Sequence, residues 1–167
     1  MTQSLRSAAT LVGLSLMLVA GAAWGWAQIS KPFPGKADPP VCVESTFSDG
    51  DKIYPQDVTV SVLNASGREG LAARTMQDLV DQGFGEGDTA NAPKGTEVAL
   101  AEIWATDSTN PAVKLVRTRF GQIEVADRDH AAAGIVVVVG DQFQSLSEGR
   151  DSVRVREDVV VCGPAVE

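Results

Sequence analysis

The stretch Val58–Phe84, VTVSVLNASGREGLAARTMQDLVDQGF, decides the fold of this chain. Its first six residues alternate between two faces, which predicts a β-strand because successive strand side chains point to opposite sides. Apolar residues then recur at intervals of three and four, which predicts a helix with one apolar face that ends at Gly83. Phe84 begins the next extended run. The apolar face comprises Leu71, Ala72, Thr75, Met76, Leu79 and Val80.

The turn between this strand and helix is the first candidate site. Ser66 and Glu69 have the spacing of a capping box, so we expect Ser66 to be the N-cap of the helix. A helix N-terminus also presents free amides and the positive end of the helix dipole, where anions bind. Because the capping box would already occupy two of these groups, a purely structural turn is the favoured interpretation. The candidate ligand- or partner-binding turn comprises Asn64, Ser66, Gly67, Arg68 and Gly70.

A second unit of the same kind follows. Thr96–Trp104 is a strand candidate, Asn110–Arg119 is predicted to be helical with Pro111 in its first turn, and another strand is expected by Val125. The wholly apolar run Ile135–Val139 predicts a central strand covered on both faces. The predicted fold class is therefore α/β, with two βαβ-like halves forming one small sheet and helices packed on it. The order of the strands stays open.

Several spaced residues resemble the LytR C-terminal domain family, over roughly Val58 to Phe143. That domain is found at the end of some LytR-CpsA-Psr cell-wall phosphotransferases and also alone behind a membrane anchor. The resemblance implies a role in the cell envelope. Ala65 departs from the glycine that is frequent at its position in the family. The matching segments are VLNASG (residues 62–67), GLA (70–72), GF (83–84) and VVGDQF (138–143).

The N-terminal segment predicts a membrane anchor. No charged residue occurs from Ser7 to Ser30, and the apolar run within this segment is long enough to cross a hydrocarbon layer, which needs ~20 residues. Trp24 and Trp26 would lie at the interface beyond it. A cleaved signal peptide ending at Ala27 is the alternative. The predicted organisation is a signal-anchor over residues 1–30, a Pro/Gly-rich linker over 31–41 and an extracytoplasmic domain over 42–167.

Two cysteines bracket this domain. Outside a membrane Cys42 and Cys162 are expected to form a disulfide, since thiols oxidise there by default; two unpaired, buried thiols are the alternative. In the tail, alternating valines with interleaved charges predict a last hairpin or edge strand before Cys162. These valines are Val153, Val155, Val159 and Val161.

Chemistry has few candidates in this sequence. Asp127, Asp129 and His130 carry metal-binding atoms, but a solvated loop is the favoured interpretation and no metal site is assigned. The chain has one histidine, and it has neither a P-loop nor a nucleophile elbow. We therefore expect no enzyme and no cofactor. A remnant enzyme using Asp127 and Asp129 is the weakest alternative.

Charge excludes one class of partner. Eleven basic and 22 acidic residues follow Lys36, a net charge of −11. Such a body is not expected to bind nucleic acid or anionic lipid by bulk attraction. The predicted function is support of cell-envelope integrity through binding of an envelope component or an envelope-assembly protein. The alternative is a ligand-binding protein that captures a lipid or glycan cell-wall intermediate.

Overall fold

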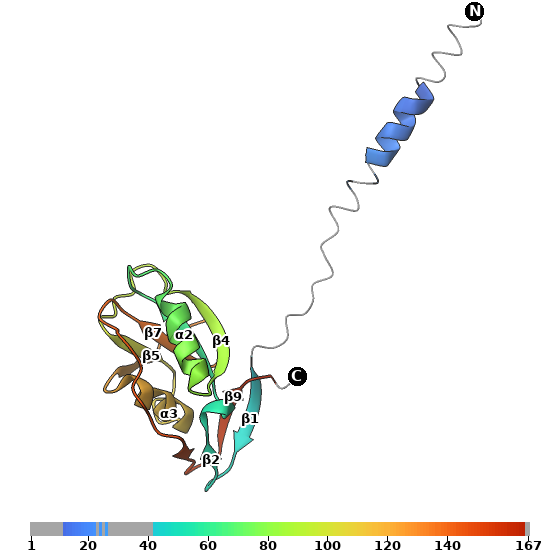
Figure 1. The fold of residues 1–167 in the computed structure, drawn as a ribbon. Coiled ribbons are helices and arrows are strands. Elements are labelled where there is room, and N and C mark those ends of the chain that lie inside the picture. The colour runs from blue at the N-terminus through green and yellow to red at the C-terminus, as the bar shows by residue number, and fades with distance from the viewer. Residues whose placement is uncertain (1–11, 23, 25, 27–41, 166–167) are drawn as a thin grey trace, which may run out of the picture. The chain divides into compact units, whose positions relative to one another are not determined.

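The computed structural model describes residues 12–22, 24, 26 and 42–165 (Figure 1). The chain divides into two units, Met1–Asp38 and Pro39–Glu167. In the first unit, residues 12–22 are helical and expose their apolar side chains. Within the described part of the chain, no helix has the length and apolarity needed to span a membrane. The predicted linker 31–41 lies outside the described residues, and the predicted anchor 1–30 lies only partly within them.

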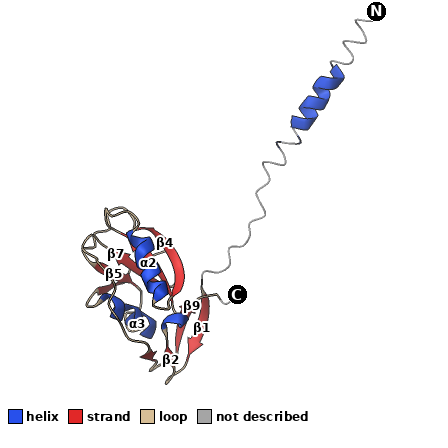
Figure 2. Cartoon of the chain, in the orientation of Figure 1, coloured by secondary structure: helices blue, strands red, loops and turns tan. Residues whose placement is uncertain are grey.

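The second unit is built on a sheet of five strands in the order β4-β3-β7-β5-β6 (Figure 2). β3 is parallel to both β4 and β7, whereas β5 is antiparallel to β7 and parallel to β6. The halves β3-α2-β4 and β5-α3-β6 therefore run in opposite directions, with β7 between them. This agrees with the two predicted βαβ-like halves and supplies the strand order. The bounds are β3 Thr59–Asn64, α2 Leu71–Asp81, β4 Gly85–Asn91, β5 Ala101–Trp104, α3 Pro111–Phe120, β6 Glu124–Ala126 and β7 Ile135–Val139.

Both helices cover one face of this sheet, and their apolar sides form the main core with it (Figures 1 and 2). The predicted apolar face of α2 is buried, except that Val80 is only partly so. α3 begins as the sequence predicts, with Pro111 in its first turn and the Asn110 side chain accepting from the amide of Ala112 at 2.9 Å. Arg119 is also buried on α3, which the apolar pattern does not predict.

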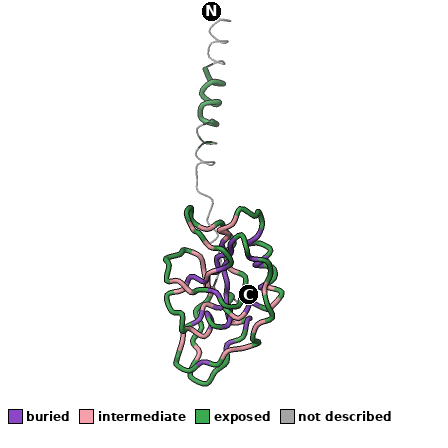
Figure 3. Tube along the Cα trace, turned by 90° about the vertical axis from the view of Figure 1, so that its left-hand side faces the viewer, coloured by how far each residue is buried: buried purple, intermediate pink, exposed green. Residues whose placement is uncertain are grey.

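The other face of the sheet has its own buried cluster, composed of Leu63, Trp104, Val136 and Val138. Loops pack against it through Ala92, Val98 and Ala132, so β3 is buried on both faces. Buried segments run through the interior of the domain, and exposed segments surround them (Figure 3). Burial includes the polar Ser61, whose hydroxyl donates to the carbonyl of Ala133 at 2.6 Å and accepts from the amide of Asp88 at 2.9 Å. Ser61 of β3 thereby bonds both to the loop before β7 and to β4.

Two predictions about strands need correction. The strand predicted over Thr96–Trp104 begins only at Ala101, because Ala99 and Leu100 bond instead to the chain after β7. For the tail, the hairpin does not form, whereas the alternative of an edge strand is correct. β8 Val153–Arg154 pairs with β2 Lys52–Ile53, and β9 Val159–Gly163 pairs with β1 Val43–Phe47, each in a sheet of two strands. The segment between β1 and β3 contains β2 and the short 3₁₀ helix Pro55–Asp57.

Candidate functional site

The predicted capping box at the start of α2 is wrong. The helix begins at Leu71, and its N-cap is Gly70 in the left-handed conformation, with φ of 70° and no side-chain cap. A left-handed backbone is strained for residues with a Cβ atom, which is why glycine suits this position. Ser66 therefore lies too early in the chain to cap the helix, and its hydroxyl is used within the turn itself.

Asn64, at the end of β3, organises this turn. Its side-chain oxygen accepts from the Ser66 amide at 2.9 Å and from the Ser66 hydroxyl at 2.7 Å, while its amide group donates to the carbonyl of Arg68 at 2.8 Å. The Ser66 hydroxyl also accepts from the amide of Arg68 at 3.1 Å. The Asn64 side chain thus supplies the hydrogen bonds of a local turn at the point where β3 ends, as asparagine commonly does.

The turn is also joined to the chain that follows β7. The amide of Gly67 donates to the carboxylate of Asp141 at 3.0 Å, and the Arg68 guanidinium donates to the carbonyls of Asp141 and Phe143. The five predicted residues do lie together, and their donors are largely engaged by the protein. The Asp141 carboxylate also places a negative charge where an anion would approach, so the geometry favours the structural interpretation of the turn.

Cys42 and Cys162 form a disulfide, as predicted. Their Cα atoms lie 5.3 Å apart and the bond spans 120 residues of chain. It lies beside the β1–β9 ladder, in which Glu44 is opposite Cys162. The two ends of the domain are therefore held by both a covalent bond and backbone pairing. Disulfides persist in oxidising compartments, which favours an extracytoplasmic location.

Asp127, Asp129 and His130 lie exposed in the loop between β6 and β7. The ring nitrogen Nδ1 of His130 is 3.0 Å from the carbonyl oxygen of Ala132. Among the described residues, no three His, Cys, Asp or Glu side chains gather as metal ligands would. A solvated loop accounts for the placement of all three residues.

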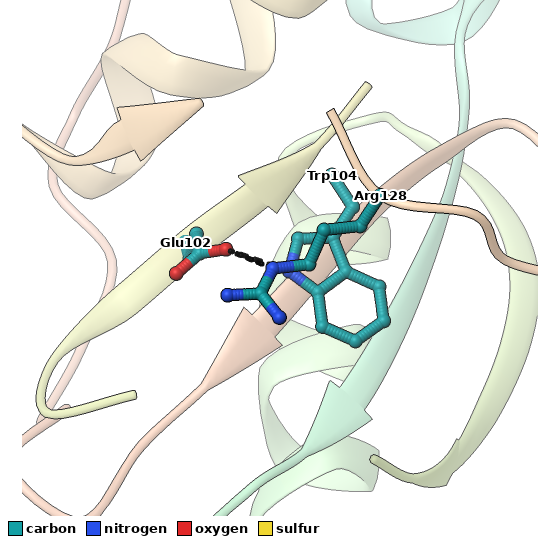
Figure 4. A network of polar contacts seen from close by, with 3 residues as sticks. All are labelled: Glu102, Trp104 and Arg128. Carbon is teal, nitrogen blue, oxygen red and sulfur yellow. Dashed lines mark hydrogen bonds and ion pairs between the residues drawn. The ribbon is translucent and has the colours of Figure 1, made fainter. Parts of the chain in front are cut away.

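Between them in sequence, Arg128 has a different role (Figure 4). Its Nε lies 3.1 Å from Oε1 of Glu102, and its guanidinium lies over the ring of Trp104, 5.5 Å from the centroid. The same Oε1 accepts from the indole nitrogen of Trp104 at 2.9 Å. Glu102 therefore satisfies the one polar atom of a buried tryptophan side chain, and Arg128 covers the pair on the face that lacks helices.

A groove of about 860 Å³ lies between the start of α3 and the tail around β8. Four cationic residues line it, namely Lys114, Arg150, Arg154 and Arg156. Three carboxylates line it as well, namely Asp107, Glu157 and Asp158. The pKa of Asp107 is lowered because the Thr109 hydroxyl and amide donate to its carboxylate and Lys114 is near, so Asp107 is ionised at neutral pH.

A family model described as LytR cell envelope-related transcriptional attenuator matches residues 57–143, which is more than half of the chain. The chain belongs to the LytR_C family. The resemblance noted in the sequence is thereby confirmed. The LytR_C segment contains the whole five-stranded sheet, both helices that cover it, and the turn with its contacts to Asp141 and Phe143.

One solved structure is similar to this LytR_C chain: the soluble domain of a conserved hypothetical secreted protein from Mycobacterium marinum. The two are 23% identical, with a TM-score of 0.47, and the similarity covers 60% of this chain and 77% of that one. No curated protein matches the sequence.

The disulfide and much of the groove lie outside the LytR_C segment. β1, β2, β8 and β9 all fall before residue 57 or after residue 143, and so do three of the four groove cations. In the sequence, Arg154 and Arg156 are two of the charges interleaved with the tail valines, and nothing in that pattern connects them with α3. The groove forms only once the tail folds against that helix, so no local pattern could have revealed it.

Proposed function

We propose that this chain is a non-enzymatic, membrane-anchored extracytoplasmic protein that supports cell-envelope integrity by binding an envelope component or an envelope-assembly protein. The observation that carries the proposal is the Cys42–Cys162 disulfide around a LytR_C domain. The bond favours an oxidising compartment, and the family description connects the domain with the cell envelope.

The order of parts gives further support. An N-terminal apolar segment, a LytR_C domain and two flanking cysteines make the chain similar to the actinobacterial envelope integrity protein Cei. Residues 12–22 form a helix whose side chains are apolar or small apart from one serine, and such a helix is costly to leave in water. Insertion of this segment in a membrane would remove that cost, so we propose it as the anchor.

If the alternative function holds, and the chain captures a cell-wall intermediate, the groove favours a glycan over a lipid as that ligand. Capture of a lipid tail would need a deep apolar pocket, whereas this groove is lined mainly by charged and polar side chains. A glycan or another polar envelope intermediate fits such a lining better than an acyl chain. A binding role of this kind needs no catalytic group in the described domain.

Photo-crosslinking in intact cells tests the proposal. A photoreactive residue at half-buried Ser152 would report on the groove, and one at exposed Gln77 on the outer side of α2. The chain should be recovered from the membrane fraction with its N-terminal segment retained and crosslinked to an envelope component or assembly protein. A mature N-terminus at Gln28, with the body in the soluble fraction, would contradict the anchor. Deletion without any change in antibiotic or detergent sensitivity would contradict the envelope role.

A further inference from the structure

We propose that the groove between α3 and the tail binds a ligand that carries a phosphate group. This inference deepens the proposed function and rests on it, because it assigns a site and a ligand chemistry to the envelope-binding role. The groove is here called the tail groove and is defined by its four cations, Lys114, Arg150, Arg154 and Arg156, and its volume of about 860 Å³. That volume accommodates a molecule considerably larger than one phosphate ion.

The charge of the tail groove differs from that of the rest of the body. Four of the eleven basic residues after Lys36 line it, and its four cations exceed its three carboxylates. Among the described residues, none of these four side chains forms an ion pair; the ion pair found there joins Arg128 and Glu102. A concentration of unpaired cations in a body of net charge −11 is a local feature that bulk charge would not produce.

The carboxylates in the tail groove are partly engaged elsewhere. Asp107 accepts from the amide and hydroxyl of Thr109 at 2.7 and 2.6 Å, and Asp158 accepts from the amide of Asp49 at 3.1 Å. Glu157 accepts no hydrogen bond from the described residues. These hydrogen bonds leave the carboxylate charges in place, but among the described residues no carboxylate forms an ion pair with the four cations. The tail groove therefore keeps a net charge of +1, four cations against three carboxylates, and Glu157 should oppose an incoming anion.

The positions of the cations are fixed by folded elements. The amide of Arg150 donates to the Thr118 hydroxyl at 3.2 Å, and its carbonyl accepts from the Arg119 guanidinium at 3.0 Å. Arg154 belongs to the β2–β8 ladder, and its guanidinium donates to the carbonyl of Gly50 at 3.3 Å. Lys114 is on α3. The backbone of three of the cations is thus held by helix, sheet or hydrogen bonds, and Arg156 lies in the bend that follows β8. Backbone positions that are already fixed lower the entropy lost when a ligand binds.

The side-chain types favour phosphate over a simple carboxylate. Guanidinium groups donate two parallel hydrogen bonds to phosphate or carboxylate oxygens, and a phosphate monoester carries about −1.5 to −2 charge at neutral pH. Three arginines and a lysine suit a group of that charge. The start of α3 adds little, because Pro111 has no amide hydrogen and Asn110 already accepts from the amide of Ala112.

The ligand could reach the groove as a lipid headgroup in a bilayer or as a soluble phosphorylated glycan. The net charge of −11 opposes approach to an anionic bilayer surface, whereas a small phosphorylated group can enter the groove without that surface. We therefore commit to a ligand presented outside the bilayer plane, such as a phosphorylated envelope glycan.

The test uses the full-length chain in a non-ionic detergent, with pyrophosphate as the probe and calorimetry or NMR titration as the measurement. Pyrophosphate should bind at millimolar or tighter affinity, and succinate should bind at least tenfold more weakly. The variant Lys114→Gln/Arg156→Gln should weaken pyrophosphate binding at least tenfold. The variant Lys94→Gln/Arg117→Gln removes the same charge outside the groove and should leave binding within twofold. Glu157→Gln should strengthen it.

Each outcome decides the inference. Equal binding of succinate and pyrophosphate, equal losses in the two double variants, or no binding at all would overturn it. Binding to phosphatidylglycerol vesicles as strong as binding to pyrophosphate would overturn the commitment to a ligand outside the bilayer. Failure of the proposed function is distinguishable from these results: pyrophosphate binding would persist in the tail groove while deletion of the chain left the envelope intact.

Discussion

The guanidinium of Arg68 donates a hydrogen bond to the backbone carbonyl of Phe143, 75 residues further along the chain. Phe143 itself is buried in the main core, where its ring packs on that of Phe120 with centroids 5.5 Å apart. Arg68 therefore connects the turn before α2 to a segment whose side chain lies under α3. Through this hydrogen bond an arginine in a surface turn contacts the segment that packs against the other half of the fold.

The variant Arg68→Ala is expected to destabilise the domain by about 1 kcal/mol, because it leaves a partly buried carbonyl without its donor. The sequence alone gives no reason to expect this loss, since a cation near the start of a helix has no favourable interaction with the dipole. Urea unfolding monitored by circular dichroism measures the difference. Arg74→Ala is the control, because the bond from Arg74 to the Glu69 carbonyl is local and exposed. Equal unfolding free energies for the two variants would contradict the proposed link.

Asn64→Ala is expected to cost at least as much stability as Ser66→Ala, about 1 to 2 kcal/mol against about 1 kcal/mol. The Asn64 side chain makes three hydrogen bonds in the turn, two of them to Ser66. The losses should also be less than additive in the double variant, because each substitution removes bonds that the other needs. A capping role for Ser66 would instead predict a loss confined to Ser66→Ala, and that result would refute the turn as described.

The local elements of this fold could be predicted because their residues carry a clear period. The apolar stripes of α2 and α3 and the uninterrupted run Ile135–Val139 each report burial within a few residues of themselves. The contrast is Ser61, which alternation assigns to the polar face of a strand. It is buried because a loop 72 residues later supplies the carbonyl of Ala133 as an acceptor.

Features that depend on distant pairing could not be predicted in the same way. The tail valines gave a strand signal, but their partners lie more than 90 residues earlier, in β1 and β2. The cap at Gly70 was missed because Ser66 and Glu69 have the right spacing for a capping box. In the structure Ser66 instead bonds to the side chain of Asn64, and its spacing from Glu69 does not reveal that contact. Arg119 was missed because its burial depends on the tail segment that its guanidinium contacts.

The disulfide should be fully formed in protein isolated from the envelope. Alkylation without reduction should modify neither Cys42 nor Cys162, as measured by intact mass. Replacing both by alanine should cost roughly 4 kcal/mol, because the bond closes a loop of 120 residues and so restricts the unfolded chain. The β1–β9 ladder should keep the variant folded at low temperature. Quantitative alkylation of both thiols in native protein would rule the bond out.

Glu102 and Arg128 are expected to differ in their effect on stability although they form one ion pair. Glu102→Ala removes the acceptor of the Trp104 indole nitrogen in a side chain that is only 3% exposed, so we expect a loss of about 1 to 3 kcal/mol. Arg128→Ala should cost at most about 1 kcal/mol, because its side chain is 52% exposed. Thermal and urea unfolding of both variants measure this. A larger loss for Arg128→Ala would show that the pairing with Trp104 is the stronger contact.

Gly149→Ala tests how the tail is held against α3. A Cβ atom at this position would lie 2.4 Å from the Thr118 hydroxyl and 2.6 Å from Cδ of Arg119, closer than folded proteins allow. The segment must therefore move away from the helix, with an expected loss of about 1 to 3 kcal/mol.

The control for this variant is Gly67→Ala, where no atom outside its immediate neighbours lies within 4 Å of the added Cβ and φ is not positive. It should be neutral or slightly stabilising, because alanine reduces the freedom of the unfolded chain. Since Gly149 precedes Arg150, the same variant should also weaken pyrophosphate binding in the tail groove, whereas Gly67→Ala should not. A stable Gly149→Ala protein with unchanged binding would mean that the tail does not depend on its contact with Thr118 and Arg119.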